Sequence, residues 1–240
     1  RQPRQGTLWV RLLVAAVLVL GLFAAFWLLP EGVGLLTTGE SGAPQNAGIV
    51  APGAQELVET LAGLQPGDGV LVAFEYGNAY AEEMAEIAAP VLDQLDTQQA
   101  AVQAVSTLPE GVVLGMRLSA APSETRYLAG NASGIANFLA RPENAAQRHL
   151  VLLASSPERV RWWLEQVALA NQSRDVPLTV SVGLSAAAGP RVAPYLQTEN
   201  VRGWLVGLPD ALTYRALRGA GATDGLEGYG RVQDILMLAH

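Results

Sequence analysis

Residues 150–170 have the sequence LVLLASSPERVRWWLEQVALA, and this stretch decides the fold. It begins with the apolar run 150–154, which is typical of a strand buried on both faces. Ser156 and Pro157 follow, where a helix favours a capping hydroxyl and then a proline. The helix continues to Ala170 with apolar residues at helical spacing. The stretch therefore predicts one strand-to-helix unit of a parallel sheet.

The same alternation of apolar strand and helix recurs on both sides of this unit. The other predicted strands are residues 70–74, 101–105, 178–183 and 201–207. The other predicted helices are residues 55–64, 79–95, 109–120, 133–139, 191–196 and 209–217. Gly111 and Gly115 are expected to weaken the helix over 109–120. We therefore expect an α/β domain of three layers, flavodoxin-like or Rossmann-like, with a mainly parallel five-stranded sheet.

An apolar segment precedes this domain. Residues 12–29, LLVAAVLVLGLFAAFWLL, carry no charge and would span roughly 27 Å as a helix, about the thickness of a bilayer core. A cleaved signal peptide is the alternative, but its apolar core is usually shorter, about 7–15 residues. Arg1, Arg4 and Arg11 all precede the segment, which predicts a cytoplasmic N-terminus and an extracytoplasmic domain at the cell membrane.

This organisation predicts four parts. Residues 1–30 form the cytoplasmic N-terminus and the membrane anchor, and residues 31–56, rich in Gly, Ala, Ser and Thr, form a linker. Residues 57–218 form the α/β domain. Residues 219–240 form a flexible glycine-rich segment with an apolar helical tail from Arg231. We expect this tail to return to the membrane; packing on the flank of the sheet is the alternative.

Composition excludes several chemistries. The chain has no lysine and no cysteine, which excludes a Schiff-base lysine, a phosphate-loop lysine, disulfides and thiolate catalysis within it. The net charge of −7 and the scattered arginines argue against nucleic acid as a partner. Two histidines are too few for the usual transition-metal sites, and no cofactor is expected. The predicted partners are the lipid bilayer and other membrane protein subunits, with Gly21, Ala24 and Ala25 as a helix-packing face.

In parallel α/β sheets, ligands bind at the carboxyl ends of the strands. Glu75, Ser106, Ser155 and Ser156 follow predicted strands and are the candidate ligand-binding residues. Glu75 could bind a metal, a sugar or a proton, but a solvated or backbone-capping carboxylate is the favoured interpretation. The two adjacent serines could bind an anion, although ordinary helix capping is favoured.

Motifs for catalysis are missing from the sequence. There is no G-x-G-x-x-G, no phosphate-binding loop and no G-x-S-x-G nucleophile elbow. His149 precedes its strand and therefore belongs to the opposite edge of the sheet, where it is expected to be solvated or hydrogen-bonded. A hydrolase would need a nucleophile and a base that the sequence does not offer, so we expect a protein that is not an enzyme. Of the neighbours Trp162 and Trp163, one is expected in the core and the other nearer the surface.

Four segments carry a resemblance to a known group of proteins. They are VLVAFEYGNAYAEEM (70–84), STLPEG (106–111), YLAGNASGI (127–135) and GWLVGLPDAL (203–212). They resemble segments of uncharacterised membrane-anchored α/β proteins from Chloroflexus-like bacteria. The resemblance implies an extracytoplasmic domain with an apolar segment at each end, and it implies no functional residue.

These observations favour a non-enzymatic accessory or scaffold subunit of a bacterial membrane protein complex. The alternative is a membrane-anchored module that binds a small polar or anionic ligand at the carboxyl ends of the strands.

Overall fold

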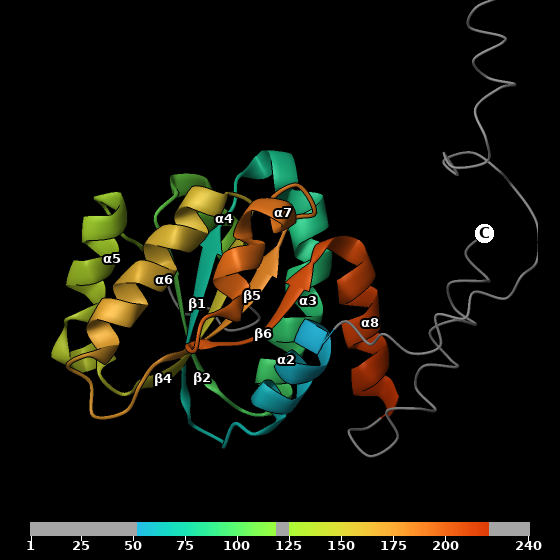
Figure 1. Ribbon diagram of the computed structural model, residues 1–240, viewed down its shortest axis with the longest axis horizontal. Coiled ribbons are helices and arrows are strands. Elements are labelled where there is room, and N and C mark those ends of the chain that lie inside the picture. The colour runs from blue at the N-terminus through green and yellow to red at the C-terminus, as the bar shows by residue number, and fades with distance from the viewer. Residues whose placement is uncertain (1–51, 119–124, 221–240) are drawn as a thin grey trace, which may run out of the picture. The chain divides into compact units, whose positions relative to one another are not determined.

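The computed structural model describes residues 52–118 and 125–220, in which strands and helices alternate (Figure 1). The strands are β1 (Gly69–Glu75), β2 (Ala101–Ser106), β3 (Arg126–Tyr127), β4 (Gln147–Ala154), β5 (Thr179–Leu184) and β6 (Val201–Val206). The helices are α2 (Pro52–Ala62), α3 (Ala81–Thr97), α4 (Pro109–Leu118), α5 (Asn131–Leu139), α6 (Pro157–Asn171), α7 (Gly189–Val192) and α8 (Gly207–Ala220). Short 3-10 turns span Asn78–Tyr80, Pro142–Asn144 and Ala193–Gln197.

The six strands form one sheet in which all described pairs are parallel, in the order β3-β2-β1-β4-β5-β6. This is the Rossmann order 3-2-1-4-5-6 and not the flavodoxin order 2-1-3-4-5. Strands β1, β2 and β3 follow one another toward one edge of the sheet. Strand β4 then lies on the other side of β1, and β5 and β6 follow it toward the opposite edge. The carboxyl ends of β1 and β4 therefore define the switch point, where proteins of this architecture usually bind ligands.

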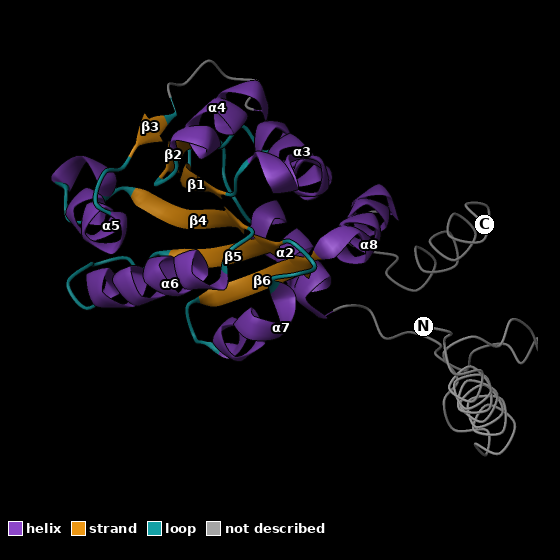
Figure 2. Ribbon diagram, turned by 90° about the horizontal axis from the view of Figure 1, so that it is seen from above, coloured by secondary structure: helices purple, strands orange, loops and turns teal. Residues whose placement is uncertain are grey.

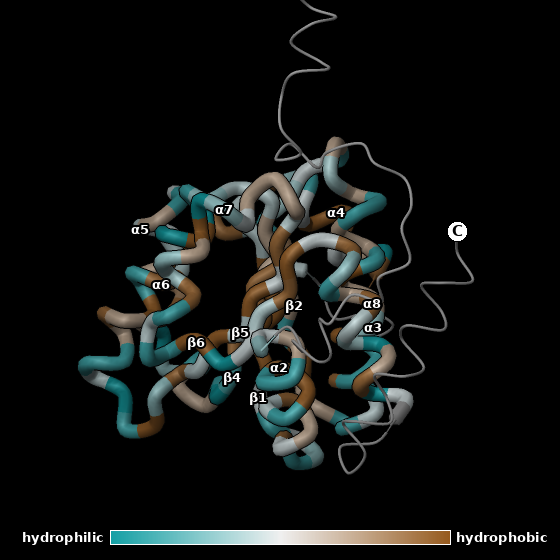
Figure 3. The backbone as a smooth tube through the Cα atoms, turned by 45° about the vertical axis from the view of Figure 1, so that its right-hand side comes forward, coloured by the Kyte–Doolittle hydropathy of each residue, from teal (hydrophilic) through white to brown (hydrophobic). Residues whose placement is uncertain are grey.

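Helices cover both faces of the sheet (Figures 1 and 2). The central strands β1 and β4 are mostly apolar, as the brown part of the tube in Figure 3 shows, because they contribute to the cores on both faces of the sheet. Along β4, Leu150 and Leu152 belong to the core shared with α5, α6 and α7. Val151 and Leu153 belong to the core shared with α2, α3, α4 and α8. The three-layer α/β prediction is therefore confirmed.

Several predicted boundaries were wrong. The sheet has six strands and not five, because β3 is a two-residue edge strand whose side chains are both exposed and so leave no apolar pattern. The first helix begins at Pro52, inside the predicted linker, and the last extends to Ala220, inside the predicted flexible tail. His149 lies within β4 and not before it.

Two glycines allow close packing that the sequence pattern did not explain. A Cβ atom on Gly111 would lie 2.2 Å from both Phe74 O and Ser106 Oγ, so only glycine lets α4 approach the sheet this closely. Gly203 in β6 has φ of +81°, and a Cβ atom there would lie 2.3 Å from Leu57 N in α2. Gly111, which was expected to weaken α4, is therefore required for the close packing of α4 on the sheet.

The predicted membrane helix over 12–29, its packing face of Gly21, Ala24 and Ala25, and the predicted apolar tail from Arg231 lie outside the described residues. Across 52–118 and 125–220, no helix combines the length and the apolar character needed to cross a bilayer.

Candidate functional site at the switch point

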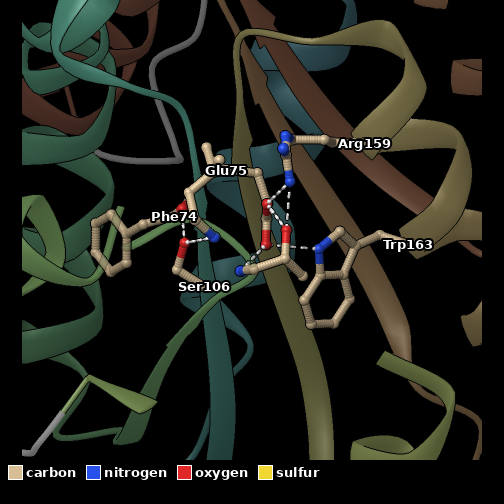
Figure 4. A network of polar contacts seen from close by, with 7 residues as sticks. Phe74, Glu75, Ser106, Arg159 and Trp163 are labelled. Atoms are coloured by element: carbon tan, nitrogen blue, oxygen red, sulfur yellow. Dashed lines mark hydrogen bonds and ion pairs between the residues drawn. The ribbon is translucent and has the colours of Figure 1, made fainter. Parts of the chain in front are cut away.

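Glu75 is the last residue of β1 and lies at the switch point with none of its surface exposed. Its Oε1 accepts hydrogen bonds from the Thr107 backbone N–H at 2.8 Å and from the Trp163 indole N–H at 3.1 Å. Its Oε2 accepts from the Thr107 hydroxyl at 2.5 Å and from Arg159 Nη1 at 3.3 Å. Figure 4 shows the Arg159 and Trp163 side chains pointing toward the Glu75 carboxylate.

The two cross-sheet donors come from one face of α6. Arg159 and Trp163 are four residues apart, so their side chains lie one above the other on the helix. Trp163 is fully buried, whereas the Arg159 side chain keeps 21% of its surface exposed. Arg159 Nη1 also donates to Thr107 Oγ1, and its guanidinium lies 5.6 Å from the centroid of the half-buried Trp162 ring. The expectation of one buried and one outer tryptophan is confirmed.

These contacts saturate the carboxylate. An ionised carboxylate offers about four acceptor positions, and Glu75 receives four hydrogen bonds, one of them from its ion-pair partner Arg159. The favoured interpretation was a solvated or backbone-capping carboxylate. Glu75 is buried and not solvated, whereas the backbone contact is present, since the Thr107 N–H is one of its donors. Elsewhere in the described chain as well, no three His, Cys, Asp or Glu side chains gather closely enough to hold a metal ion.

Ser106 is likewise engaged within the protein. Its hydroxyl donates to Phe74 O at 2.6 Å and accepts from the Leu108 backbone N–H at 2.9 Å, and the residue is fully buried. Ser106 therefore lies inside the protein and not on an open edge of the sheet, and a part in ligand binding stays a prediction. Its hydroxyl joins β1 to the start of α4.

The two serines after β4 are more accessible. Both are half-buried, and Ser156 is the N-cap residue of α6, as expected. Its hydroxyl makes no capping hydrogen bond; its carbonyl accepts the Val160 N–H at 3.2 Å instead. The Ser155 backbone N–H donates to Glu75 O at 3.3 Å, which ties the ends of β4 and β1 together.

The turn after β1 is contacted by a carboxylate of α4, at the place where a dinucleotide fold presents its phosphate-binding glycines. Glu110 Oε2 in α4 accepts the Asn78 backbone N–H at 3.2 Å. A Cβ atom on Gly77 would lie 2.5 Å from the same oxygen, so the turn and the carboxylate are in close contact. A negative side chain at this amide opposes the binding of phosphate there.

Two other hydroxyl groups at the carboxyl edge of the sheet are also buried. Tyr76 and Ser185 are fully buried, and their hydroxyls have no hydrogen-bond partner among the described residues. Burial raises the pKa of Tyr76, which stays a neutral phenol at physiological pH. Burial also raises the pKa of Asp210 after β6, an effect opposed by the hydrogen bond from the Val206 N–H.

His149 takes no part in this site. It is buried near the amino ends of the strands, with Nδ1 2.7 Å from Thr179 Oγ1 and Nε2 3.0 Å from Ser181 Oγ. Ser181 donates its own hydroxyl hydrogen to Arg202 O, so His149 Nε2 is assigned as the protonated nitrogen. Burial lowers the pKa of His149 to about 4, which keeps the ring neutral. The hydrogen-bonded expectation is confirmed and the solvated one was wrong.

Arg159 and Trp163 are the partners that the sequence analysis missed. They lie 84 and 88 residues from Glu75, so no local spacing connects them with it. The available signal was their separation of four residues on the apolar face of α6. That spacing places Arg159 beside the buried Trp163 on α6, the helix that follows β4.

Comparisons with known proteins give little beyond this geometry. No family model matches the chain, and no curated protein is similar to it. Among solved structures, the crystal structure of AibC aligns with a TM-score of 0.38 and 13% sequence identity. The match covers 76% of this chain and 51% of that chain, so the chain spans about half of that protein's length.

Proposed function

We propose that the chain is a non-enzymatic accessory subunit, held at a bacterial membrane by residues 12–29, whose α/β domain binds another protein of a membrane complex. The observation that carries the proposal is the saturated Glu75 carboxylate at the switch point. In this architecture the switch point is where ligands normally bind. Here its most reactive side chain is used to join β1, the loop after β2 and α6.

An exposed apolar surface supports protein binding. Val113 and Met116 of α4 are 49% and 54% exposed, and Tyr127 of the neighbouring edge strand β3 is 50% exposed. We call these three residues the α4–β3 surface. Large apolar side chains exposed on neighbouring elements favour contact with a partner protein, and aromatic residues and methionine are enriched in interfaces.

The anchor strengthens this proposal in two ways. Membrane attachment raises the effective concentration for a lateral partner, so a modest interface is sufficient. The resemblance to membrane-anchored proteins of Chloroflexus-like bacteria supports the same topology, with the domain on the extracytoplasmic side.

The test is purification of the full chain from its native membrane in mild detergent. We expect a partner subunit at fixed stoichiometry with the wild type, and its loss with the double variant Met116→Ser/Tyr127→Ser. The matched control is Leu212→Ser. Leu212 is a large apolar residue that is also exposed, at 38%, but it lies on a different helix, α8. Recovery of the wild type only as a free monomer would contradict the proposal.

A ligand-binding module is the second candidate, and one observation favours it. Arg159 uses only Nη1 for Glu75 and Thr107, so its Nε and Nη2 hydrogens make no hydrogen bond to a described residue. Arg159 lies in the first turn of α6, three residues after the half-buried N-cap residue Ser156, and a helix N-terminus with these guanidinium hydrogens is a place where a small anion could bind. Titration with inorganic phosphate, compared between the wild type and Arg159→Gln, distinguishes this candidate from the first.

A further inference from the structure

A groove of about 620 Å³ lies along the carboxyl-terminal half of α6, and neither Arg159 nor Trp163 lines it. Its walls are α5, the turn that follows α5, and the loop 173–176 after α6. Leu139 lies on the α5 side, and Gln166, Leu169 and Ala170 lie on the α6 side. Its volume falls within the range of small-molecule sites, roughly 300–1,000 Å³.

Small side chains create the hollow and large apolar ones border it. Ala136, Ala140, Ala145 and Ala170 line the groove, so little side-chain volume fills the space between the two helices. Leu169, also in the lining, is 56% exposed, the most exposed large apolar side chain among the described residues. Such exposure of leucine costs free energy in water and is relieved by an apolar ligand.

One wall of the groove is fixed by Arg174. Its Nη2 donates to Asn144 O at 3.2 Å, Ala145 O at 3.0 Å and Gln147 O at 2.6 Å. Its Nε donates to Val176 O at 3.4 Å. The remaining nitrogen, Nη1, makes no hydrogen bond to a described residue. The loop is therefore held in place before any ligand binds, which reduces the entropic cost of binding.

The charges of the lining favour an anion. Arg141 and Arg174 contribute two guanidinium groups against one carboxylate, that of Asp175. Among the described residues, the Arg141 side chain pairs only with Glu143, at 3.7 Å, and 46% and 61% of the two side chains are exposed. An exposed pair of this kind is worth little, so Arg141 can turn to a ligand at small cost.

We propose that this groove binds a small amphiphilic carboxylate, with an aromatic or branched apolar body against Leu139, Leu169 and Ala170 and its anionic group at Arg141 and Arg174. The proposal is independent of the protein-binding function, because the groove includes no residue of the α4–β3 surface.

The test uses 4-phenylbutyrate and its neutral analogue 4-phenylbutanol as probes. The full chain is reconstituted in lipid nanodiscs, and binding is measured by ligand-observed NMR, with empty nanodiscs subtracted for partition into lipid. We expect the wild type to bind the carboxylate with a Kd of about 1 mM, as is usual for a ligand of this size. The alcohol is expected to bind about fivefold to tenfold more weakly.

Matched variants locate the site. Arg141→Gln should abolish the preference for the acid, whereas Arg161→Gln should not, although Arg161 has a comparable exposed ion pair with Glu165 at 3.6 Å. Leu169→Ser should weaken both probes, whereas Leu212→Ser on α8 should weaken neither. Leu169 is exposed, so its variant should unfold at the wild-type temperature. Absence of binding by the wild type, equal affinity for acid and alcohol, or equal effects of the groove and control variants would overturn the proposal.

Discussion

Arg159 Nη1 lies 3.3 Å from Glu75 Oε2, and this ion pair joins the two halves of the Rossmann-like sheet at their switch point. Glu75 ends the first strand of one half, and Arg159 belongs to the helix that follows the first strand of the other. The pair therefore stabilises the place where related architectures are left open for a ligand.

Glu75→Ala is predicted to lower the free energy of unfolding by about 3–5 kcal/mol, because it leaves the Arg159 charge and the Trp163 N–H without their acceptor. Urea unfolding of the full chain measures the effect. The control is Glu165→Ala, which removes an exposed ion pair and should cost no more than about 0.5 kcal/mol. Equal costs for the two variants would contradict a structural role for Glu75.

Stability is predicted to fall in acid because of His149. Burial lowers its pKa to about 4 in the folded state, whereas an unfolded histidine titrates near 6.5. The unfolded state therefore binds the proton first, and stability present above about pH 6.5 is lost as the pH falls toward 4. Between pH 7 and pH 4.5 the wild type should lose about 2–3 kcal/mol more than His149→Gln. Parallel pH profiles of the two proteins in urea unfolding would contradict the lowered pKa of His149 in the folded state.

Gly111→Ala is predicted to destabilise the domain by about 1–3 kcal/mol, because the new methyl group would meet Phe74 O and Ser106 Oγ at 2.2 Å. Gly219→Ala in α8 is the matched control, since a Cβ there would meet no atom within 4 Å beyond its chain neighbours and the adjoining backbone of its own helix. Alanine favours a helix over glycine, so this control should be neutral or slightly stabilising. Thermal unfolding followed by circular dichroism compares them. A control as damaging as Gly111→Ala would refute the packing explanation.

Tyr214→Phe is predicted to cost about 1–2 kcal/mol. The Tyr214 hydroxyl donates to Gln94 Oε1, and Gln94 Nε2 donates to Val58 O at 3.1 Å, so the phenol connects α8 through α3 to α2. Limited proteolysis should then cut between α2 and the sheet faster than in the wild type. Tyr127→Phe, at a residue that is 50% exposed, should leave the cleavage rate unchanged. Equal cleavage rates for the two variants would show that the hydrogen bonds from Tyr214 through Gln94 to Val58 do not hold α2 in place.

The sequence predicted the elements that bury a repeating apolar pattern. The central strands were placed within one to three residues, because apolar runs such as 150–154 are sufficient to identify them. The edge strand β3 was missed, since Arg126 and Tyr127 bury no side chain. The position of Glu75 at the carboxyl edge was correct, but its environment was not. Its partners come from segments 32 to 88 residues away, and only the folded sheet brings them together.

The central claim is that the switch point is closed by protein donors around Glu75. Hydrogen exchange of the indole N–H groups tests it most directly, because Trp163 donates to Glu75 while its neighbour Trp162 is half-buried and outside that contact. The two NMR signals are assigned by substituting each tryptophan in turn with phenylalanine. The account predicts that the Trp163 indole exchanges orders of magnitude more slowly than that of Trp162. Equal, rapid exchange of both would show that water reaches Glu75 and would contradict the claim.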